Sequence, residues 1–196
     1  DIYYWTKSSG LTVRAVSLSS IAGANQVPTV ANGIMVSTSN RCLIAFACNE
    51  NGSATQDLLL VRWSSQENAL EWEPRPDTQA RSDRIASGSQ YITAIRSRQE
   101  IIIWTDRGIN TMGFVGPPYT FGFNLSADNN TIMGPNSMAS ARNTLYWMDL
   151  KEFRLYNGAV STIPCTVQDY VFSNLNIEQR YKVWAVSNTL YDEIWW

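Results

Sequence analysis

The sequence predicts an all-β fold in which one four-stranded antiparallel unit is repeated along the chain. Short runs rich in β-branched and aromatic residues alternate with polar turns. Two features also recur. Trp104 and Trp147 are 43 residues apart, and the phrase Asn-Thr-Leu-Tyr begins at Asn143 and again, 45 residues later, at Asn188. Four-stranded units of about 43–45 residues are typical of β-propeller blades. A β-sandwich, which also has short strands between turns, is the competing interpretation.

The first unit is expected at residues 31–75 and is the loosest copy. It runs from Ile34 through the apolar segments RCLIAFACN and DLLLVRW to EWEPR. The segment NENGSAT between the two apolar runs is interpreted as a hairpin loop because turn-forming residues dominate it. A polar stretch near residues 77–89 is expected to separate this unit from the next one.

The second unit is expected at residues 90–118. It contains three strand-like runs, YITAIRSR, EIIIWTD and GINTMGFVG, which are separated at Gln99-Glu100 and at Asp106-Arg107-Gly108. Gly116-Pro117-Pro118 and the following Phe121-Gly122-Phe123 are interpreted as a rigid connection between units. An exposed contact hook is the alternative for this segment.

The third unit, residues 136–165, is predicted in most detail. Strands are expected at residues 139–141, 144–148, 153–156 and 160–163, with Asn157-Gly158 as a two-residue hairpin turn. Ile102, Trp104, Leu145 and Trp147 are expected to fill the space between neighbouring units.

The fourth unit, residues 182–196 (KVWAVSNTLYDEIWW), stops in the middle of a strand, so the chain is expected to be an incomplete part of a longer one. Helix is expected only as a turn or two at residues 173–180.

Composition favours a subunit of a larger assembly. Charged residues make up 16% of the chain, against roughly 25% in an average soluble protein, and there are 8 Trp and 9 Tyr. The net charge of −2 offers no basic surface for holding nucleic acid. No apolar run approaches the roughly 20 residues of a membrane span, so no membrane insertion is expected.

The three cysteines, Cys42, Cys48 and Cys165, are expected to be reduced. Cys42 and Cys48 are placed six residues apart in one strand, which separates them by about 20 Å. A disulfide requires Cα atoms within about 7 Å. Apolar neighbours and an odd number of cysteines indicate buried thiols and assembly in a reducing cytoplasm.

The sequence indicates that the protein is not an enzyme and binds no cofactor or metal. Without histidine, the Ser-His-Asp and Cys-His nucleophile systems and histidine-containing zinc sites are excluded. The cysteines lack Cys-x-x-Cys spacing, and neither a P-loop nor a Gly-x-Gly-x-x-Gly motif is present. No catalytic, cofactor-binding or metal-binding residue is therefore assigned.

Several acidic residues are candidates for a site but are interpreted as turn residues. The segment WTDRGINT keeps Asp106 and Gly108 of the Asp-box of sialidase-like propellers but lacks its Ser, Thr and Trp positions. Asp149 and Glu152 fall at turns, and no pair of carboxylates is marked out for glycoside hydrolysis. Asp128-Asn129-Asn130 lacks the alternating acidic pattern of a calcium loop and is expected to be a polar turn.

Whole phrases of the chain resemble a known family. LLLVRWSSQEN, RQEIIIWTDRGINTMGFVGPPYTFGF, NTLYWMDLKEFRLYNG, PCTVQDYVFSNLN and the final EIWW are similar to nozzle-type tail proteins of short-tailed bacteriophages, also called tail tubular protein B or packaged-DNA stabilisation proteins. The resemblance runs from about residue 57 to residue 196 and is fainter over the first fifty residues.

The resemblance implies a propeller-bearing structural protein of the virion tail that is assembled in the host cytoplasm. Its partners would be further copies of itself in a ring-shaped homo-oligomer, the tail adaptor and the tail fibre proteins. DNA would pass through the ring during ejection without sequence-specific binding. The family has no catalytic residues to carry over to this chain.

Two other functions fit the same fold. One is a carbohydrate-binding or glycan-cleaving propeller of a receptor-binding tail component, in which exposed aromatic side chains would stack on sugars. The other is a cellular propeller scaffold for protein–protein contacts.

Overall fold

The computed structural model describes residues 1–98 and 100–196. Of these residues, 44% lie in strands and 10% in helices, which confirms the all-β prediction. The chain forms two compact units. The N-terminal unit comprises residues 1–86 and 114–122, and the C-terminal unit comprises residues 87–113 and 123–196. Gln99, which the sequence assigned to a turn, lies outside the described residues.

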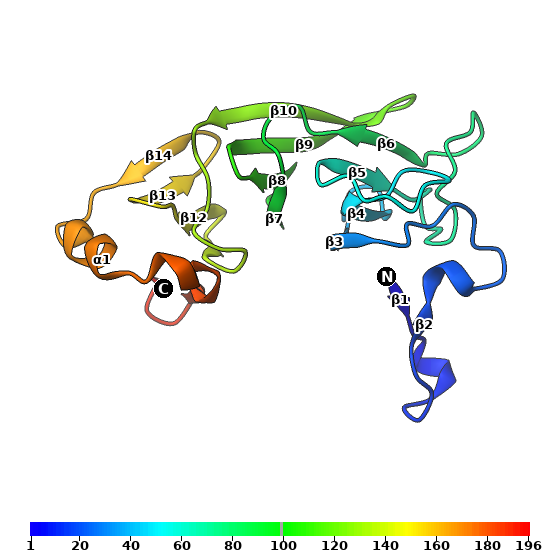
Figure 1. The fold of residues 1–196 in the computed structure, drawn as a ribbon, viewed down its shortest axis with the longest axis horizontal. Coiled ribbons are helices and arrows are strands. Elements are labelled where there is room, and N and C mark those ends of the chain that lie inside the picture. The colour runs from blue at the N-terminus through cyan, green and yellow to red at the C-terminus, as the bar shows by residue number, and fades with distance from the viewer. Residues whose placement is uncertain (99) are drawn as a thin grey trace. The chain divides into compact units, whose positions relative to one another are not determined.

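The first four-stranded sheet lies in the N-terminal unit (Figure 1). Its strands are β3 (Ala31–Val36), β4 (Leu43–Cys48), β5 (Leu60–Trp63) and β6 (Arg81–Arg84), each antiparallel to the next. The expected end of this unit at residue 75 is wrong, since β6 falls within the polar stretch near residues 77–89 that the sequence predicted as a separator. An edge strand needs only backbone hydrogen bonds to one neighbour and can carry polar side chains. Ser82, Asp83 and Arg84 are accordingly exposed.

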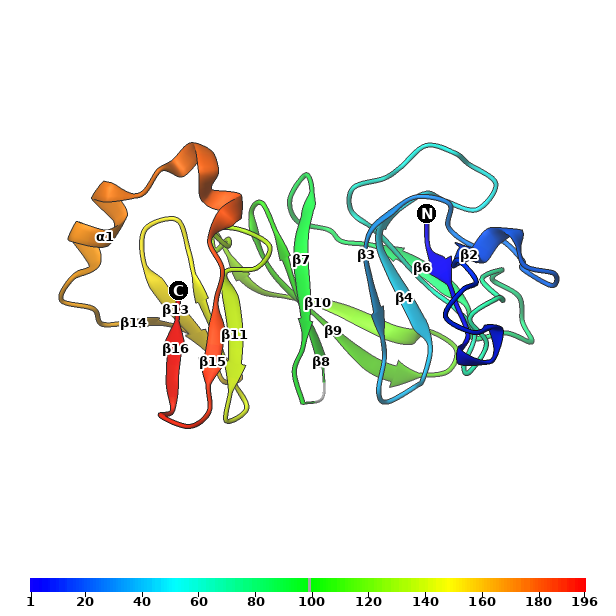
Figure 2. The same ribbon diagram turned by 90° about the horizontal axis from the view of Figure 1, so that it is seen from below.

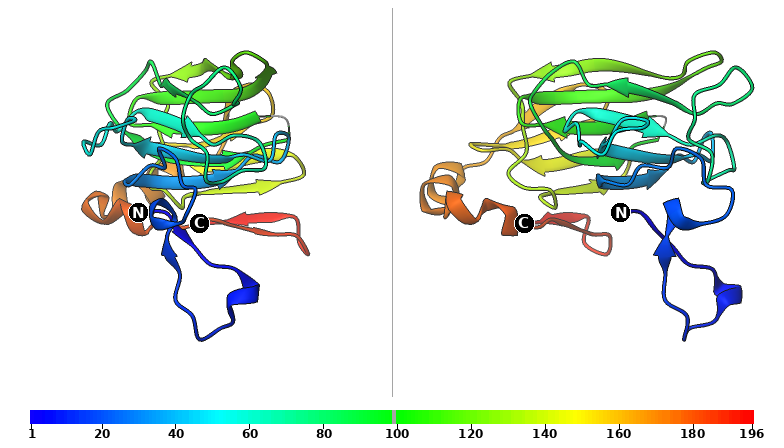
Figure 3. Two further views of the ribbon diagram at one scale, coloured as in Figure 1. Left: turned by 90° about the vertical axis from the view of Figure 1, so that its right-hand side faces the viewer. Right: turned by 45° about the vertical axis from the view of Figure 1, so that its right-hand side comes forward.

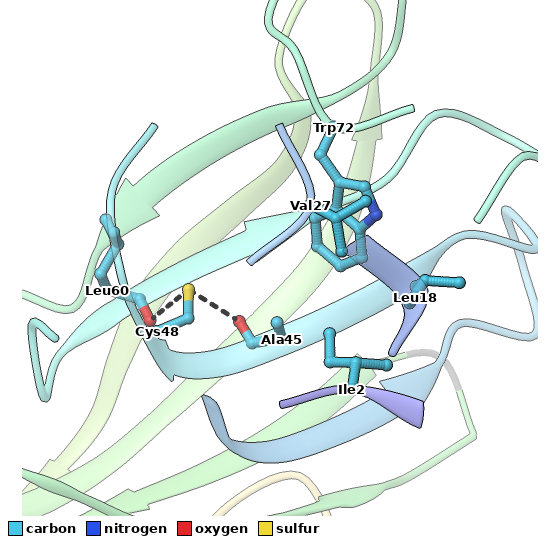
Figure 4. Packing of buried hydrophobic residues seen from close by; sticks show 7 residues of the cluster. All are labelled: Ile2, Leu18, Val27, Ala45, Cys48, Leu60 and Trp72. Atoms are coloured by element: carbon cyan, nitrogen blue, oxygen red, sulfur yellow. Dashed lines mark hydrogen bonds between the residues drawn. The ribbon is translucent and has the colours of Figure 1, made fainter. Parts of the chain in front are cut away.

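The core of the N-terminal unit is built against β4 and β5 (Figure 4). Trp72 is buried there, and its indole Nε1–H donates to the Ala69 carbonyl at 2.7 Å. The EWEPR segment is therefore an irregular stretch that contributes a core residue. The buried members of this cluster are Ile2, Leu18, Val27, Ala45, Cys48, Leu60 and Trp72.

The N-terminal residues of this unit form a separate two-stranded sheet. It pairs β1 (Tyr3–Tyr4) with β2 (Val16–Ser17), and short 3-10 helices lie at Lys7–Ser9 (η1) and Leu18–Ser20 (η2). Ile2 and Leu18 are buried in the core just described, so the base of this hairpin is anchored. The connection between its strands extends away from the β3–β6 sheet (Figure 3).

The second four-stranded sheet has the order β10-β9-β8-β7. The sequence predicted its first three strands, which the structure places at β7 (Tyr91–Arg96), β8 (Glu100–Thr105) and β9 (Gly108–Gly116). The fourth strand, β10 (Thr120–Asp128), was not expected.

The interpretation of residues 116–123 as a connection between two four-stranded repeats is therefore wrong. The expected end of the second repeat at residue 118 is also wrong. Pro117 and Pro118 lie in the turn between β9 and β10. Proline has no backbone N–H, and in this turn no sheet hydrogen bond requires one. Phe121 to Phe123 lie inside β10. The Phe121 ring meets that of Trp63, within the N-terminal unit, edge-to-face with centroids 5.2 Å apart.

The third four-stranded sheet confirms the predicted strands. It consists of β11 (Met138–Ala141), β12 (Thr144–Met148), β13 (Phe153–Tyr156) and β14 (Val160–Ile163) in consecutive antiparallel order. Asn157-Gly158 lies in the turn between β13 and β14, and Gly158 has a φ of 113° that favours glycine. Two short helical segments follow, α1 (Gln168–Asn174) and the 3-10 helix η3 (Ile177–Lys182), so helix begins earlier than the expected residues 173–180.

The last sheet pairs only two strands, β15 (Val186–Asn188) and β16 (Glu193–Trp195), and β15 lies beside β11 (Figure 2). The repeated Asn-Thr-Leu-Tyr phrase occupies different elements in its two occurrences, so its 45-residue spacing is not a structural repeat. In the first, Asn143 ends a two-residue turn and Leu145 is 2% exposed in β12. In the second, Asn188 ends β15 and Leu190, 80% exposed, lies in the turn. The flanking residues determine whether the phrase enters a buried strand or a turn, because apolar Trp-Met follows the first phrase and charged Asp-Glu follows the second.

The core of the C-terminal unit lies between its two four-stranded sheets. The prediction that Ile102, Trp104, Leu145 and Trp147 fill this space is confirmed, since all four are buried in one cluster with Ile109, Ile132 and Tyr156. No helix in residues 1–98 and 100–196 is long and apolar enough to cross a membrane.

Candidate functional site

An apolar groove lies in the C-terminal unit, next to the β15–β16 hairpin. Its volume is about 520 Å³. It is named the aromatic groove here, and its lining residues are Met148, Phe153, Val171, Leu175, Lys182, Val183, Trp184 and Trp196. Trp184 is 60% exposed, which is unusual for so large an apolar side chain.

The walls of the aromatic groove are held by specific contacts. The Trp196 indole donates a hydrogen bond from Nε1 to the Ser137 carbonyl at 3.2 Å and packs on Phe153 with ring centroids 5.0 Å apart. The Phe153 ring also packs on the Phe172 ring of α1, with ring centroids 5.3 Å apart. The backbone N–H of Ala185 donates to the Asn136 carbonyl at 2.8 Å, which fixes the segment leading into β15.

The lining of the groove is almost entirely apolar. Lys182 is the one charged residue in its lining, and its Nζ donates to Gln179 Oε1 at 2.9 Å. The remaining lining side chains are aliphatic, aromatic or thioether groups, which bind apolar side chains by excluding water. The sequence analysis missed this surface because its residues come from β12, β13, α1 and the β15–β16 region, whose packing no local pattern reveals.

Asp149 and Glu152, which the sequence placed at a turn, share one cation. Arg154 Nε contacts Asp149 Oδ2 at 2.8 Å, and Arg154 also pairs with Glu152. Burial raises the pKa of Asp149, while the hydrogen bond from the Leu150 N–H and the Arg154 charge act to lower it. Both carboxylates therefore stabilise the turn between β12 and β13.

Asp106 lies in the turn between β8 and β9, as the sequence predicted. Its carboxylate accepts hydrogen bonds from the Ser89 N–H at 2.7 Å, the Ser89 hydroxyl at 2.6 Å and the Gln90 N–H at 3.2 Å. Partial burial acts to raise its pKa, but these donors outweigh burial and lower the pKa of Asp106. The three bonds fix the loop that precedes β7, so Asp106 has a structural role.

The segment Asp128-Asn129-Asn130 is a polar turn at the end of β10. Asp128 pairs with Arg107 Nε at 3.2 Å, and the Asn130 side chain donates to the Asp128 carbonyl at 2.6 Å. Asn129 has a φ of 55°, a conformation that asparagine tolerates in turns. Within the described ranges, no group of His, Cys, Asp or Glu side chains is arranged to hold a metal ion.

A polar groove in the N-terminal unit, with a volume of about 480 Å³, brings together acids far apart in sequence. Antiparallel pairing of β5 with β6 places Asp83 and Arg84 near Asp57. Asp57 Oδ2 contacts Arg84 Nε at 2.8 Å, and Oδ1 accepts the Leu59 N–H at 2.9 Å. Burial acts to raise the pKa of Asp57, but these contacts lower it overall. Both oxygens are engaged, so this acid is not poised for proton transfer.

Two of the three thiols, those of Cys42 and Cys48, are unreactive because they are buried. Cys42, Cys48 and Cys165 are free, and the first two are buried. Burial raises the pKa of Cys42 to about 11 and that of Cys48 to about 12. Because the thiolate is the nucleophile and metal ligand, neither group suits catalysis near neutral pH.

Arg62 is a buried cation that sequence reasoning did not single out. It lies on β5 and is 2% exposed. Its guanidinium donates to the Asn49 carbonyl at 2.9 Å, to the Gln26 carbonyl and to the Asn51 side chain, and it lies 5.9 Å from the centre of the Trp72 ring. These contacts join β5 to two loops of the N-terminal unit.

Comparison with known proteins adds no assignment, because no family model matches the chain and no curated protein matches it.

Proposed function

We propose that this protein is a structural subunit of a bacteriophage tail, of the nozzle type, which forms part of the channel for DNA ejection and a docking surface for other tail proteins. The observation that carries the proposal is the series of three consecutive four-stranded meanders followed by a two-stranded one. This is the order of strands expected of successive propeller blades, and the resemblance of the chain to nozzle proteins implies the same architecture.

Packing within the C-terminal unit supports the propeller part of the proposal. Trp104 and Trp147 occupy the second strand of successive sheets and meet in one core. Adjacent blades of a propeller pack face to face in this way, through large side chains of the inner strands. In the proposed architecture β15 and β16 are the two inner strands of a further blade.

The surface also supports a role in assembly. Exposed large apolar side chains lie on the elements that contribute to the aromatic groove, namely Tyr170 on α1, Tyr181 on η3, Trp195 on β16, and Trp184. Large exposed apolar patches mark interaction sites. The net charge of −2 suits a channel protein, since a strongly basic lining would retain the phosphates of moving DNA.

Sedimentation and negative-stain microscopy of the protein, alone and with purified tail adaptor, test this proposal. We expect closed rings that bind the adaptor end-on. A protein that stays monomeric at all concentrations and does not bind the adaptor would contradict it.

A glycan-binding or glycan-cleaving propeller is the second candidate, because exposed tryptophan and tyrosine rings can stack on sugars. Binding to a glycan array or release of reducing sugars, each abolished by Trp195→Ala, would favour that function. The engagement of Asp57, Asp106, Asp149 and Glu152 in structural contacts argues against cleavage.

A further inference from the structure

The dipeptide Asn-Gly occurs three times in the chain, at Asn32-Gly33, Asn51-Gly52 and Asn157-Gly158. Glycine has no side chain to shield its backbone nitrogen from the carboxamide of the preceding asparagine. Attack of that nitrogen on the asparagine Cγ leads to deamidation, which converts a neutral side chain into an acid. Because the three copies share this sequence, their structural surroundings decide which of them can react.

Hydrogen bonds hold both reacting groups of Asn51-Gly52. The Asn51 side-chain oxygen accepts a hydrogen bond from the buried Arg62 guanidinium, and the Gly52 N–H donates to Gln26 Oε1 at 3.2 Å. The first bond fixes the Asn51 carboxamide, and the second directs the Gly52 N–H to another acceptor. Both bonds oppose ring closure at this position.

A strand restrains the second copy, Asn32-Gly33. The pair lies inside β3, where Gly33 is opposite Phe46 of β4. Asn32 Oδ1 accepts a hydrogen bond from Gln56 Nε2 at 2.8 Å. A five-membered ring needs a backbone conformation at Asn32 that a paired strand does not have, so β3 would have to open locally before the reaction.

Asn157-Gly158 has neither restraint. Both residues are exposed in the loop between β13 and β14. Within residues 1–98 and 100–196, neither the Asn157 carboxamide nor the Gly158 N–H makes a hydrogen bond. The loop is closed by a long hydrogen bond from the Asn157 N–H to the Ala159 carbonyl, at 3.4 Å. An exposed loop with so few hydrogen bonds can rearrange at little cost in free energy.

We propose that Asn157 is a site of spontaneous deamidation in the folded protein, whereas Asn32 and Asn51 are protected by their surroundings. The Gly158 nitrogen loses its proton to solvent hydroxide and bonds to Asn157 Cγ. The Cγ–Nδ2 bond then breaks, and ammonia leaves behind a five-membered succinimide. Water opens this ring at Cγ to give aspartate, or at the backbone carbonyl carbon to give isoaspartate. The net change is amide plus water to acid plus ammonia, so the reaction needs no partner and does not depend on the proposed function.

The new carboxylate changes the charge of a polar groove. This groove, with a volume of about 270 Å³, is lined by Ser97, Arg98, Glu100, Asn143, Tyr156, Asn157 and Gly158. Arg98 and Glu100 are its charged residues, and the Tyr156 hydroxyl donates to Glu100 Oε1 at 2.6 Å. Deamidation therefore gives the lining an excess of negative charge. The aspartate product keeps the hairpin, because Asp-Gly favours the same turns as Asn-Gly.

Peptide mapping of the aged protein tests the proposal. The full chain is incubated at neutral and at mildly alkaline pH and digested with trypsin, and fragmentation in the mass spectrometer locates each acid that has formed. We expect Asn157 to lose its amide at least about tenfold faster than Asn32 or Asn51, because the latter react only after local opening. The rate should rise with pH, since the deprotonated backbone nitrogen attacks. Labelling by an isoaspartyl methyltransferase should detect the second product at the same position.

Two controls separate structure from sequence. In urea, which removes the structure, the three copies should react at similar rates. Gln26→Asn shortens the acceptor of the Gly52 N–H and suits the φ of 54° at this position, so it should accelerate the reaction of Asn51 and leave that of Asn157 unchanged. Equal rates in the folded protein, or an Asn157 that stays intact while the chain in urea reacts, would overturn the proposal. A difference in rate that persists in urea would refute the assigned protection.

Discussion

Trp104 and Trp147 meet edge-to-face in the core of the C-terminal unit, with ring centroids 5.5 Å apart and an angle of 69° between the rings. They occupy the second strands of successive sheets, and both are fully buried. Aromatic pairs in this geometry contribute about 0.5–1.5 kcal/mol beyond their buried area. This pair is therefore a direct physical link between two repeated sheets.

The two tryptophans should differ in their response to phenylalanine. Trp147 Nε1 donates to the Thr131 carbonyl at 3.1 Å, whereas Trp104 Nε1 is buried without an acceptor among the described residues. Trp147→Phe leaves the part-buried Thr131 carbonyl without this donor, which adds about 1 kcal/mol to the loss of ring volume. Trp104→Phe removes an unsatisfied donor and should destabilise less. Urea unfolding of both variants measures the difference, and equal effects would contradict the assigned hydrogen bond.

The two copies of Asn-Thr-Leu-Tyr provide a matched pair of substitutions. Leu145→Ala should lower the free energy of unfolding by about 2–5 kcal/mol, since a buried leucine is truncated. Leu190→Ala changes an exposed turn residue and should have an effect within about 0.5 kcal/mol. Thermal and urea unfolding of the two variants check this. Similar losses from both would mean that the second phrase is a core strand like the first.

Asp106 should make stability depend on pH. Its folded-state pKa is below the ordinary value of 3.8, so its contribution to stability is present above that value and is lost as the pH falls through the lower, folded-state pKa. Asp106→Asn should destabilise the protein by about 1 kcal/mol at neutral pH, and the difference from the unchanged protein should shrink in acid. Unfolding curves across this pH range test it, with Glu178→Gln, at an exposed position, as the control. A difference that stays constant with pH would show that the charge is not responsible.

The thiols should react in two classes. Cys42 and Cys48 are buried with pKa values raised to about 11 and about 12, whereas Cys165 is partly exposed. At pH 8 in the native state, a thiol reagent should label Cys165 and spare the other two. All three should react after denaturation without reductant. Rapid labelling of Cys48 in the folded protein would place it outside the core.

Local sequence patterns predicted strands best where each strand had both apolar alternation and a turn signal. The sheet β11–β14 met this condition, with Asn157-Gly158 marking one of its turns, and its predicted strands match the structure. β6 and β10 were missed for different physical reasons. β6 is a polar edge strand that is defined by its backbone pairing to β5, and β10 follows two prolines that form a turn within the sheet.

The candidate site was less accessible to sequence reasoning. Assigning Asp106, Asp149 and Glu152 to turns required only local patterns, and that assignment is confirmed. The aromatic groove depends on packing between Phe153, Val171 and Trp196, which lie on separate elements. The repeated Asn-Thr-Leu-Tyr phrase predicted a structural repeat that is absent for a related reason. Four identical residues do not determine which of them lie in a strand and which in a turn, because the neighbouring residues differ.

Single-particle electron cryo-microscopy of the protein mixed with the proposed partner, a phage tail adaptor, can show both the ring and the packing of its sheets. We expect a ring with an axial channel, in which successive four-stranded sheets pack as propeller blades and Trp104 contacts Trp147. A map in which the sheets form a two-layer sandwich, or in which single copies bind no neighbour and enclose no channel, would contradict it.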